Sequence, residues 1–431
     1  MSLAPLNAAS LSARAELPAR PPVRIVHLGL GAFHRAHQAW YTAHASDADG
    51  WGIAAFTGRS PHAAQVLSAQ DGFYTLTTRG PERDDVEIVT SIVEAHDGAD
   101  VAALADLLVR PEVAIVTLTV TEAGYDAQPG QDSPLRRLLH GLEARRSAHA
   151  GPLAIVPCDN VPANGTVVRE RLSSLARDVS PLLVDWLDEQ VSFVSTSVDR
   201  ITPRWEGTPV PAVEELGWDD AAPVITEPFS SWVLEGDFPG GRPQWEDAGA
   251  VFVQSVEHYE HRKLWLLNGA HSILAWSGLR RGLVTVAQAT ADAECRALVH
   301  DFWEEAARHL PEEADTARYC RDLEERFANA RMEYRLAQIA TDSANKWGAR
   351  LAAVARRERD AGREARACAA GLAQWVLGLS SVEPLEDVRN AEVAAATQQA
   401  DPVTALVSVV DAPLAQDHAF VSMIKEVVTR G

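Results

Sequence analysis

The sequence predicts an α/β fold, in which a doubly wound parallel sheet with helices on both faces is followed by a mostly α-helical domain. Through the first 250 residues or so, short apolar runs typical of buried strands alternate with stretches that suit helices. This alternation is typical of a covered parallel sheet. Beyond that point, long stretches rich in Ala, Leu, Glu and Arg dominate, with few strand signals. We therefore expect an α/β domain over residues 1–255 and a helical domain over residues 256–431.

The expected elements of the first domain follow one another closely. Residues 1–22 end in two prolines and are expected to be a flexible lead-in, and residues 238–243 a turn or linker. The predicted strands are Val23–Leu28, Gly52–Phe56, Val113–Val120, Ala154–Pro157 and Val191–Thr196. The predicted helices are Ala32–Ala45, Ala63–Ala69, Val101–Leu108, Pro134–Arg145 and Val167–Arg177.

The second domain is expected to be built from long helices. They are predicted over Lys263–Leu279, Ala291–Arg308, Ala317–Phe327 and Lys346–Ala361. The run rich in Ala and Arg from Ala352 to Ala370 is expected to form one helix with a solvated charged face.

Composition excludes several classes of function. The 431 residues include 39 Lys and Arg against 60 Asp and Glu, a net charge of −21. Such an acidic surplus argues against nucleic-acid or anionic-membrane partners. No apolar run reaches the length of about 18–20 residues that spans a bilayer, and the N-terminus does not resemble a signal peptide. We expect a cytoplasmic protein with reduced cysteines, because the four cysteines lie far apart.

The first motif with chemical meaning is a glycine turn. Gly29 and Gly31 stand between a buried strand and a helix, and His34 takes the place of a third glycine. Glycines there let the backbone approach a pyrophosphate at a helix N-terminus. The turn predicts a Rossmann-type dinucleotide site with Gly29, Gly31, Ala32 and Phe33 at the cofactor; the alternative is a plain strand-to-helix turn. The strand ending at Phe56 is not followed by the acid that commonly binds the ribose 2′-hydroxyl of NAD. Arg59 could instead contact the 2′-phosphate of NADP, so both cofactors stay open. The alternative is that Arg59 is simply solvated.

A second group of polar residues lies near the start of the helical domain. At about 100° per helical residue, Glu260, Lys263, Asn268 and His271 fall within an arc of about 140°. A lysine in a water-poor cleft exchanges a proton near neutral pH, and an amide stabilises a developing alkoxide. The alternative is ordinary helix surface.

The spacing of the histidines is also compatible with a metal site. His34 with His37, and His258 with His261, are spaced three apart on expected helices. No HExxH motif or cysteine cluster accompanies them, so we expect no metal. A zinc-dependent hydrolase is therefore the less favoured alternative.

Several segments together resemble the mannitol dehydrogenase family, the polyol-specific long-chain dehydrogenases that include fructuronate (D-mannonate) oxidoreductases. The matching segments are GLGAFHRAHQ at Gly29–Gln38, TVTEAGY at Thr119–Tyr125, CDNVPANG at Cys158–Gly165, VSFVSTSVDRITP at Val191–Pro203, residues Trp232–Phe238, and KxxxxNxxH at Lys263–His271. They span most of the chain, so coincidence is a poor explanation.

The resemblance implies roles for individual residues. It makes Lys263 the general base for alcohol oxidation, and Asn160 and Asn268 the amide pair that binds the reacting oxygen. It places His271 at the substrate, makes Glu260 a proton-relay carboxylate and gives Asp199 an influence on the lysine pKa. Asp199 could instead form an ion pair with Arg200. Thr121 and Glu122 fall in the segment that the resemblance assigns to the cofactor, for which NAD is slightly favoured.

A third region extends the resemblance. Arg326–Asn329 and Tyr334–Lys346 are similar to the family's RFxN and HRxxQIAxDGSxK stretches, which would place Lys346 and Arg350 at the substrate. Four residues depart from the family pattern, where proline, histidine, glycine and serine are usual: Ala330, Tyr334, Ser343 and Ala344.

We therefore expect a metal-independent, NAD(P)-dependent dehydrogenase that interconverts a secondary alcohol and a ketone on a small open-chain polyol or hexonate. The QIA-type stretch favours D-mannonate and fructuronate. Three alternative activities stay open: that of a mannitol 2-dehydrogenase, that of another polyol dehydrogenase, and that of a polyol-phosphate enzyme such as mannitol-1-phosphate 5-dehydrogenase. A non-catalytic nucleotide-binding protein is an alternative from a different class. We expect a monomer or a weak homo-oligomer.

Overall fold

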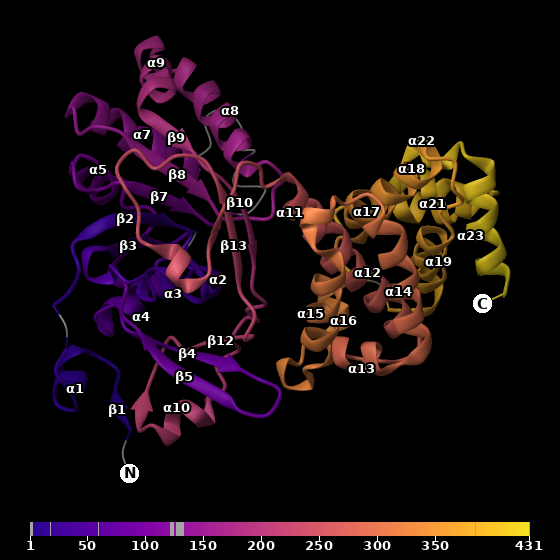
Figure 1. Cartoon of the computed structure of the whole chain (residues 1–431), viewed down its shortest axis with the longest axis horizontal. Coiled ribbons are helices and arrows are strands. Elements are labelled where there is room, and N and C mark those ends of the chain that lie inside the picture. The colour runs from indigo at the N-terminus through magenta and orange to yellow at the C-terminus, as the bar shows by residue number, and fades with distance from the viewer. Residues whose placement is uncertain are drawn as a thin grey trace. The chain divides into compact units, whose positions relative to one another are not determined.

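The computed structural model describes residues 3–17, 19–58, 60–120, 125, 133–383 and 385–430. Contacts divide the chain into two compact units, Met1–Glu257 and His258–Gly431 (Figure 1). The first unit is α/β and the second is mostly helical, so the predicted fold class is confirmed.

A six-stranded sheet forms the centre of the first unit. The strand order is β6-β3-β2-β7-β8-β9, and every neighbouring pair is parallel. Chain order therefore reverses between β2 and β7, which is the place where doubly wound folds bind ligands. In sheet order the strands are β6 (Ile92–His96), β3 (Gly52–Phe56), β2 (Val23–Leu28), β7 (Ile115–Leu118), β8 (Leu153–Pro157) and β9 (Val191–Phe193).

Successive residues of the strands supply two separate apolar cores, one on each face of this sheet. On β3, Ile53 and Ala55 join one core, whereas Ala54 and Phe56 join the other. Helices α2 (Ala32–Ala36), α3 (Gln38–Ala43) and α4 (His62–Ala69) cover the first face. Helices α5 (Val101–Leu108), α7 (Pro134–Ser147), α8 (Asn164–Arg177) and α9 (Pro181–Gln190) cover the second (Figure 1).

A fully buried arginine connects two helices of the second face. The guanidinium of Arg145 donates to five main-chain oxygens, at 2.8–3.2 Å. They belong to Leu108, the last residue of α5, to Arg110 after it, and to Ala150, Gly151 and Pro152 after α7. Burial lowers the pKa of Arg145 to about 10.

Smaller sheets accompany the main one, and most of their strands, like β6 of the main sheet, were not predicted from the sequence. They are β12 (Val224–Thr226) with β4 (Tyr74–Arg79) and β5 (Asp84–Val89), and β10 (Ser195–Asp199) with β13 (Ser231–Glu235) and β14 (Val251–Phe252). The single strand predicted over Val191–Thr196 was wrong, because the chain passes from one sheet to another at Val194. The expected helix after the glycine turn breaks at His37, whose φ is −120° and ψ −90°. The expected lead-in contains β1 (Ala4–Pro5), which pairs with β11 (Trp218–Asp219), and α1 (Ala8–Ser12).

The second unit packs around α12 (Ala270–Arg280), whose residues from Ala270 to Gly278 are all buried. Its neighbours include α13 (Val286–Ala291), α14 (Ala293–Ala307), α16 (Leu336–Ile339) and α19 (Arg366–Ser381). The other described α-helices are α11 (Glu257–Arg262), α15 (Thr316–Ala328), α17 (Ser343–Trp347), α18 (Ala353–Asp360), α20 (Asn390–Thr397), α21 (Pro402–Val410), α22 (Ala412–Ala415) and α23 (His418–Arg430). The single helix expected over Ala352–Ala370 was wrong, because α18 ends at Asp360 and Gly362 has a φ of +75°.

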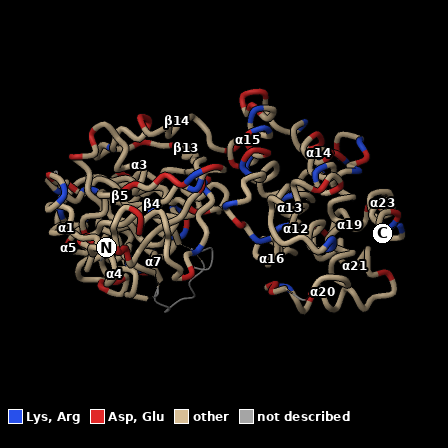
Figure 2. Tube along the Cα trace, turned by 90° about the horizontal axis from the view of Figure 1, so that it is seen from below, with Lys and Arg blue, Asp and Glu red and all other residues tan. Residues whose placement is uncertain are grey.

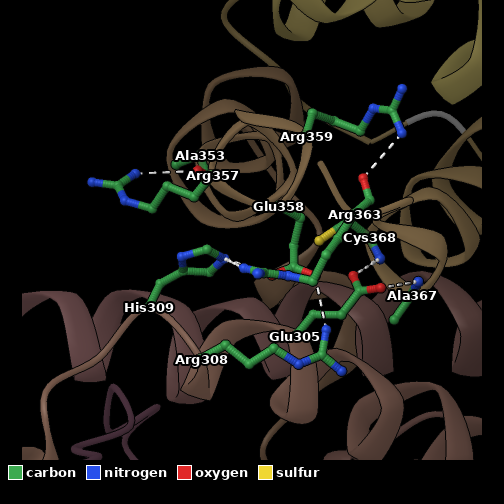
Figure 3. A network of polar contacts seen from close by, with 10 residues as sticks. All are labelled: Glu305, Arg308, His309, Ala353, Arg357, Glu358, Arg359, Arg363, Ala367 and Cys368. Carbon is green, nitrogen blue, oxygen red and sulfur yellow. Dashed lines mark hydrogen bonds and ion pairs between the residues drawn. The ribbon is translucent and has the colours of Figure 1, made fainter. Parts of the chain in front are cut away.

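Two buried carboxylates hold α14, α18 and α19 together (Figure 3). Glu358 lies 2.8 Å from Arg308 and 2.7 Å from both His309 and Arg363. Glu305 accepts hydrogen bonds from the first-turn N–H groups of α19, at Ala367 and Cys368. Burial raises the pKa of Glu358, but hydrogen bonds from Arg363 and His309 outweigh it, so the pKa lies below its ordinary value of 4.5.

Acidic residues occur in both units (Figure 2), but most of the net charge of −21 belongs to the first, which has 35 Asp and Glu against 18 Lys and Arg, whereas the second has 25 against 21. No described helix is long and apolar enough to cross a membrane.

Candidate active site

The glycine turn follows β2 at the point where strand order reverses. Gly29 has a φ of +117°, and a Cβ there would lie 2.3 Å from the main-chain oxygen of Thr119. The fold itself therefore requires Gly29. A Cβ at Gly31 would meet only the oxygen of Gly29, at 3.6 Å, which is ordinary contact. The fold leaves the space beside Gly31 open, as a residue that a cofactor approaches closely would require.

Two neutral histidines lie beneath this turn. The ring nitrogens of His27 lie 2.8 Å from the Thr117 hydroxyl and 3.0 Å from the Thr119 hydroxyl. Because the Thr119 hydroxyl donates to the oxygen of Gly29, it accepts from Nε2 of His27, and Nδ1 accepts from Thr117. Burial lowers the pKa of His27 to about 3. The ring of His34 stacks on it at 3.3 Å, and burial followed by repulsion from His27 holds the pKa of His34 well below 6.5.

The neighbouring cofactor positions are only partly described. Ala32 and Phe33 begin α2, directly after Gly31. Arg59, Thr121 and Glu122 lie outside the described residues, and their expected roles stay predictions.

The segments that carry Asn160 and Asp199 are joined within the first unit. Asn160 is exposed in the loop after β8, and Asp199 is buried at the end of β10. Asn164 bridges the two segments, because its amide accepts from Thr196 N at 2.9 Å and donates to Thr196 O at 3.0 Å. A Cβ at Gly165 would lie 2.7 Å from Ser195 N, so both residues of this Asn-Gly pair are needed for packing.

Other residues of the same motifs also have structural partners. The Tyr125 hydroxyl donates to the carboxylate of Asp159, which joins the TVTEAGY and CDN segments. Arg200 donates to the oxygens of Ala36 and Glu227 and lies over the ring of Trp40. The sequence analysis did not identify Tyr125 or Arg200 as functional residues.

In the second unit the segment Glu257–His271, called the lysine segment because it carries Lys263, is not a regular α-helix. Glu260 lies on α11 (Glu257–Arg262), and Lys263 and Asn268 lie on a π-helical segment, η3 (Lys263–Gly269). His271 lies at the start of α12. The predicted arc of about 140° assumed uniform α-helix. That assumption was wrong, since a π-helix closes each hydrogen bond one residue later, and such segments occur frequently at functional sites.

Asn268 lies where two π-helical segments contact each other. Arg350 belongs to the second segment, η6 (Gly348–Ala352), and its Nη1 donates to the main-chain oxygen of Asn268 at 3.1 Å. The same Nη1 lies 2.8 Å from the Ser272 hydroxyl, which donates to the oxygen of Asn268 at 3.2 Å. Burial lowers the pKa of Arg350 to about 10, and Tyr334 partly opposes this shift.

His271 is 6% exposed and lies between two aromatic rings. Its ring centroid is 4.8 Å from that of Phe327 and 5.4 Å from that of Tyr334. The sequence analysis noted Tyr334 only as a departure from the family pattern, and it assigned no role to Phe327 or Ser272. Nothing in the local sequence distinguishes Ser272 from the other small buried residues of α12.

Lys346 lies on α17, and its ammonium donates to the main-chain oxygens of Ile339 and Thr341. Of the other departures, Ser343 makes side-chain hydrogen bonds, whereas the features at Ala344 and Ala330 involve the main chain. The Ser343 hydroxyl accepts from Trp276 Nε1 at 2.8 Å and donates to Ala340 O. Ala344 N donates to the Asp387 carboxylate, and Ala330 opens a short 3₁₀ turn.

The described residues contain no group of three His, Cys, Asp or Glu side chains arranged to hold a metal ion. His37 packs among Phe33, Tyr41 and Trp232, and His261 stacks on Trp265.

Comparison with known proteins gives consistent matches over the whole chain. The model of the mannitol dehydrogenase Rossmann domain matches residues 23–247, and that of the mannitol dehydrogenase C-terminal domain matches residues 255–430. A D-mannonate oxidoreductase of Escherichia coli is 37% identical, over 82% of this chain and 79% of that protein. A mannitol 2-dehydrogenase of Aspergillus terreus is 33% identical, over 75% of this chain and 71% of that protein.

A solved structure supports the same relationship. The ternary complex of Pseudomonas fluorescens mannitol 2-dehydrogenase with NAD and D-mannitol matches with a TM-score of 0.85 and 29% identity, over 99% of this chain and 96% of that one. The chain therefore belongs to the mannitol dehydrogenase family, and it is an NAD(P)-dependent oxidoreductase that acts on CH–OH groups of polyols or sugar acids.

Proposed function

We propose that this enzyme interconverts D-mannonate and fructuronate. The observation that carries the proposal is the set of amide, amine and imidazole side chains of Asn268, Lys263 and His271 on one continuous helical run. The identity of 37% with a D-mannonate oxidoreductase, against 33% with the mannitol 2-dehydrogenase, favours a sugar acid.

In this proposal Lys263 exchanges the proton of the reacting hydroxyl. The Asn268 and Asn160 amides donate to the oxygen as it gains negative charge. His271, fixed between Phe327 and Tyr334, contacts a neighbouring hydroxyl. Glu260 relays the proton onward, Asp199 helps to set the lysine pKa, and Lys346 faces the polar end of the substrate.

The residues of the glycine turn fit a dinucleotide cofactor. Gly29, Gly31, Ala32 and Phe33 would hold it, with Gly31 offering backbone that no side chain covers. When bound, NAD or NADP supplies the acceptor or donor of the hydride. NAD is favoured because it is the cofactor of the Pseudomonas fluorescens complex.

Mannitol and fructose are the second candidate pair, favoured by the TM-score of 0.85 with the mannitol complex. A spectrophotometric screen of hexonates, neutral polyols and their keto forms, with each cofactor, separates the two. We expect the highest kcat/KM with D-mannonate and fructuronate. Turnover of mannitol without turnover of either sugar acid would contradict the proposal.

A further inference from the structure

Arg350 contacts the main chain of the lysine segment at one specific place. Its Nη1 lies 3.1 Å from the oxygen of Asn268 and 2.8 Å from the hydroxyl of Ser272. Asn268 and Ser272 are four residues apart, which is the separation that a main-chain hydrogen bond joins in an α-helix. The oxygen of Asn268, which the Ser272 N–H would contact in a regular α-helix, thus accepts from the Arg350 side chain.

The irregularity is found at this contact. The π-helical segment η3 ends at Gly269, directly after Asn268, and regular α-helix resumes at Ala270. The Ser272 hydroxyl donates to the same oxygen of Asn268, at 3.2 Å. Two side-chain donors from different elements thus meet on one carbonyl at the end of the π-helical segment.

This carbonyl belongs to a residue whose side chain has a proposed role in catalysis. Fixing the main chain of Asn268 restricts where its amide points, and it fixes the π-helical segment that begins with Lys263. Arg350 is half-buried and lies on η6, which contacts η3. A planar guanidinium holds such an acceptor in a defined direction.

We infer that Arg350 and Ser272 are positioning residues, which hold the π-helical segment so that Asn268 and Lys263 address the same substrate oxygen. The inference rests on the proposed roles of these two residues. It differs from the sequence-based expectation that Arg350 binds the substrate, because the contacts of Nη1 are with main chain and hydroxyl.

The test compares Arg350→Lys and Ser272→Ala with the wild-type protein, on both a hexonate and a neutral polyol. A misplacement of about 1 Å costs about 10²-fold in rate, so we expect Arg350→Lys to lose about 10²-fold in kcat. Ser272→Ala removes one neutral hydrogen bond, to Asn268 O, and one from the charged Arg350, so we expect a loss in kcat of at least about five-fold. In both variants we expect the KM values and the cofactor affinity to stay within about two-fold, because the substrate contacts remain.

Two matched variants serve as controls. Ser277 lies on the same helix and donates in the same way to the oxygen four residues earlier, that of Ile273, but does not contact Asn268. Arg280, also on α12, donates to the Gln374 side chain. Ser277→Ala and Arg280→Lys should therefore keep kcat near the wild-type value.

Because Arg350 and Ser272 act on one atom, the double variant should lose less than the product of the single losses. A rise in KM confined to the hexonate would overturn the inference and make Arg350 a substrate ligand. Lower thermal stability with unchanged kcat would also overturn it, as would equal losses in the controls. The kcat and KM values of each variant are compared with those of the wild type on whichever substrate the wild type turns over. The identity of that substrate tests the proposed function separately.

Discussion

Gly29 and Thr119 approach each other so closely that only a glycine fits beside the threonine. A Cβ at Gly29 would lie 2.3 Å from the main-chain oxygen of Thr119 and 2.7 Å from its hydroxyl. The hydroxyl donates to the oxygen of Gly29 at 2.8 Å, so the ends of β2 and β7 are joined where the strand order reverses.

Gly29→Ala should therefore destabilise the protein as well as weaken cofactor binding. A φ of +117° is strained for any residue with a Cβ, and the methyl group would displace Thr119. We expect a loss of about 2–4 kcal/mol in the free energy of unfolding, measured by denaturant titration.

Gly31→Ala distinguishes a role of the glycine turn in cofactor binding from a role in folding. The added Cβ would meet one oxygen at 3.6 Å, so the unfolding free energy should change by less than about 1 kcal/mol. Cofactor affinity, measured by titration calorimetry, should fall at least about ten-fold, because the methyl group occupies the space left for the dinucleotide. Unchanged affinity would show that the turn is only structural.

Lys263→Ala tests the acid–base assignment. General acid–base catalysis contributes about 10²–10⁴-fold, so we expect kcat to fall by that factor while cofactor affinity stays constant. Lys425 is a suitable control, because it forms an exposed ion pair with Asp401 on the surface of the second unit. If Lys263→Ala turned over substrate as fast as Lys425→Ala, the assignment would be wrong.

The carboxylate of Glu358 makes the stability of the second unit depend on pH. Its pKa in the folded protein lies below the ordinary value of 4.5. A group whose pKa falls on folding stabilises the fold above its unfolded pKa, and this contribution disappears as the pH drops through the folded value. Melting temperatures should therefore fall below about pH 4.5, more steeply in the wild type than in Glu358→Gln.

At neutral pH, Glu358→Gln should lower the unfolding free energy by about 2 kcal/mol, because the charged Arg308 and Arg363 lose their carboxylate partner and keep only hydrogen bonds to a neutral amide. Glu364→Gln is the matched control, since Glu364 pairs with Arg366 in exposed positions. Equal melting curves for these two variants would contradict the structural role of Glu358.

Arg145→Met should be among the more damaging substitutions in the first unit. It removes the five hydrogen bonds of a fully buried guanidinium to main-chain oxygens, two of them fully buried, so we expect a loss of about 3 kcal/mol or more in the unfolding free energy. Arg169→Met, at an exposed ion pair with Asp188, should cost less than about 1 kcal/mol. Both values follow from urea denaturation monitored by tryptophan fluorescence.

Five of the six strands of the parallel sheet were predictable, because they coincide with local apolar runs. The edge strand β6 was missed, because its sequence IVEAH contains Glu94 and His96 and is only partly buried. The glycine turn was also visible, since its meaning depends on a few consecutive residues. The division of Val191–Asp199 between two sheets was not, because the partners of β9 and β10 lie elsewhere in the chain: Leu153–Ile155 for β9 and Ser231–Glu235 for β10. Local propensity does not encode which partner a strand takes.

The candidate site shows the same limit. Lys263, Asn268 and His271 could be found from their spacing and from the family resemblance. The π-helical segment could not, because its contact with Arg350 joins residues 82 positions apart. Ser272 and Phe327 likewise gain significance only through what the fold places against Asn268 and His271.

The imidazoles of His27 and His34 stay uncharged over the pH range in which such an enzyme would be assayed. With a pKa of about 3 for His27, and one well below 6.5 for His34, acidification from about pH 8 to about pH 6 leaves the support of the glycine turn uncharged. A bend in the pH–rate profile over that interval therefore reports on other ionisable groups. Over this interval the turn that receives the dinucleotide therefore keeps the same charge on the two imidazoles beneath it.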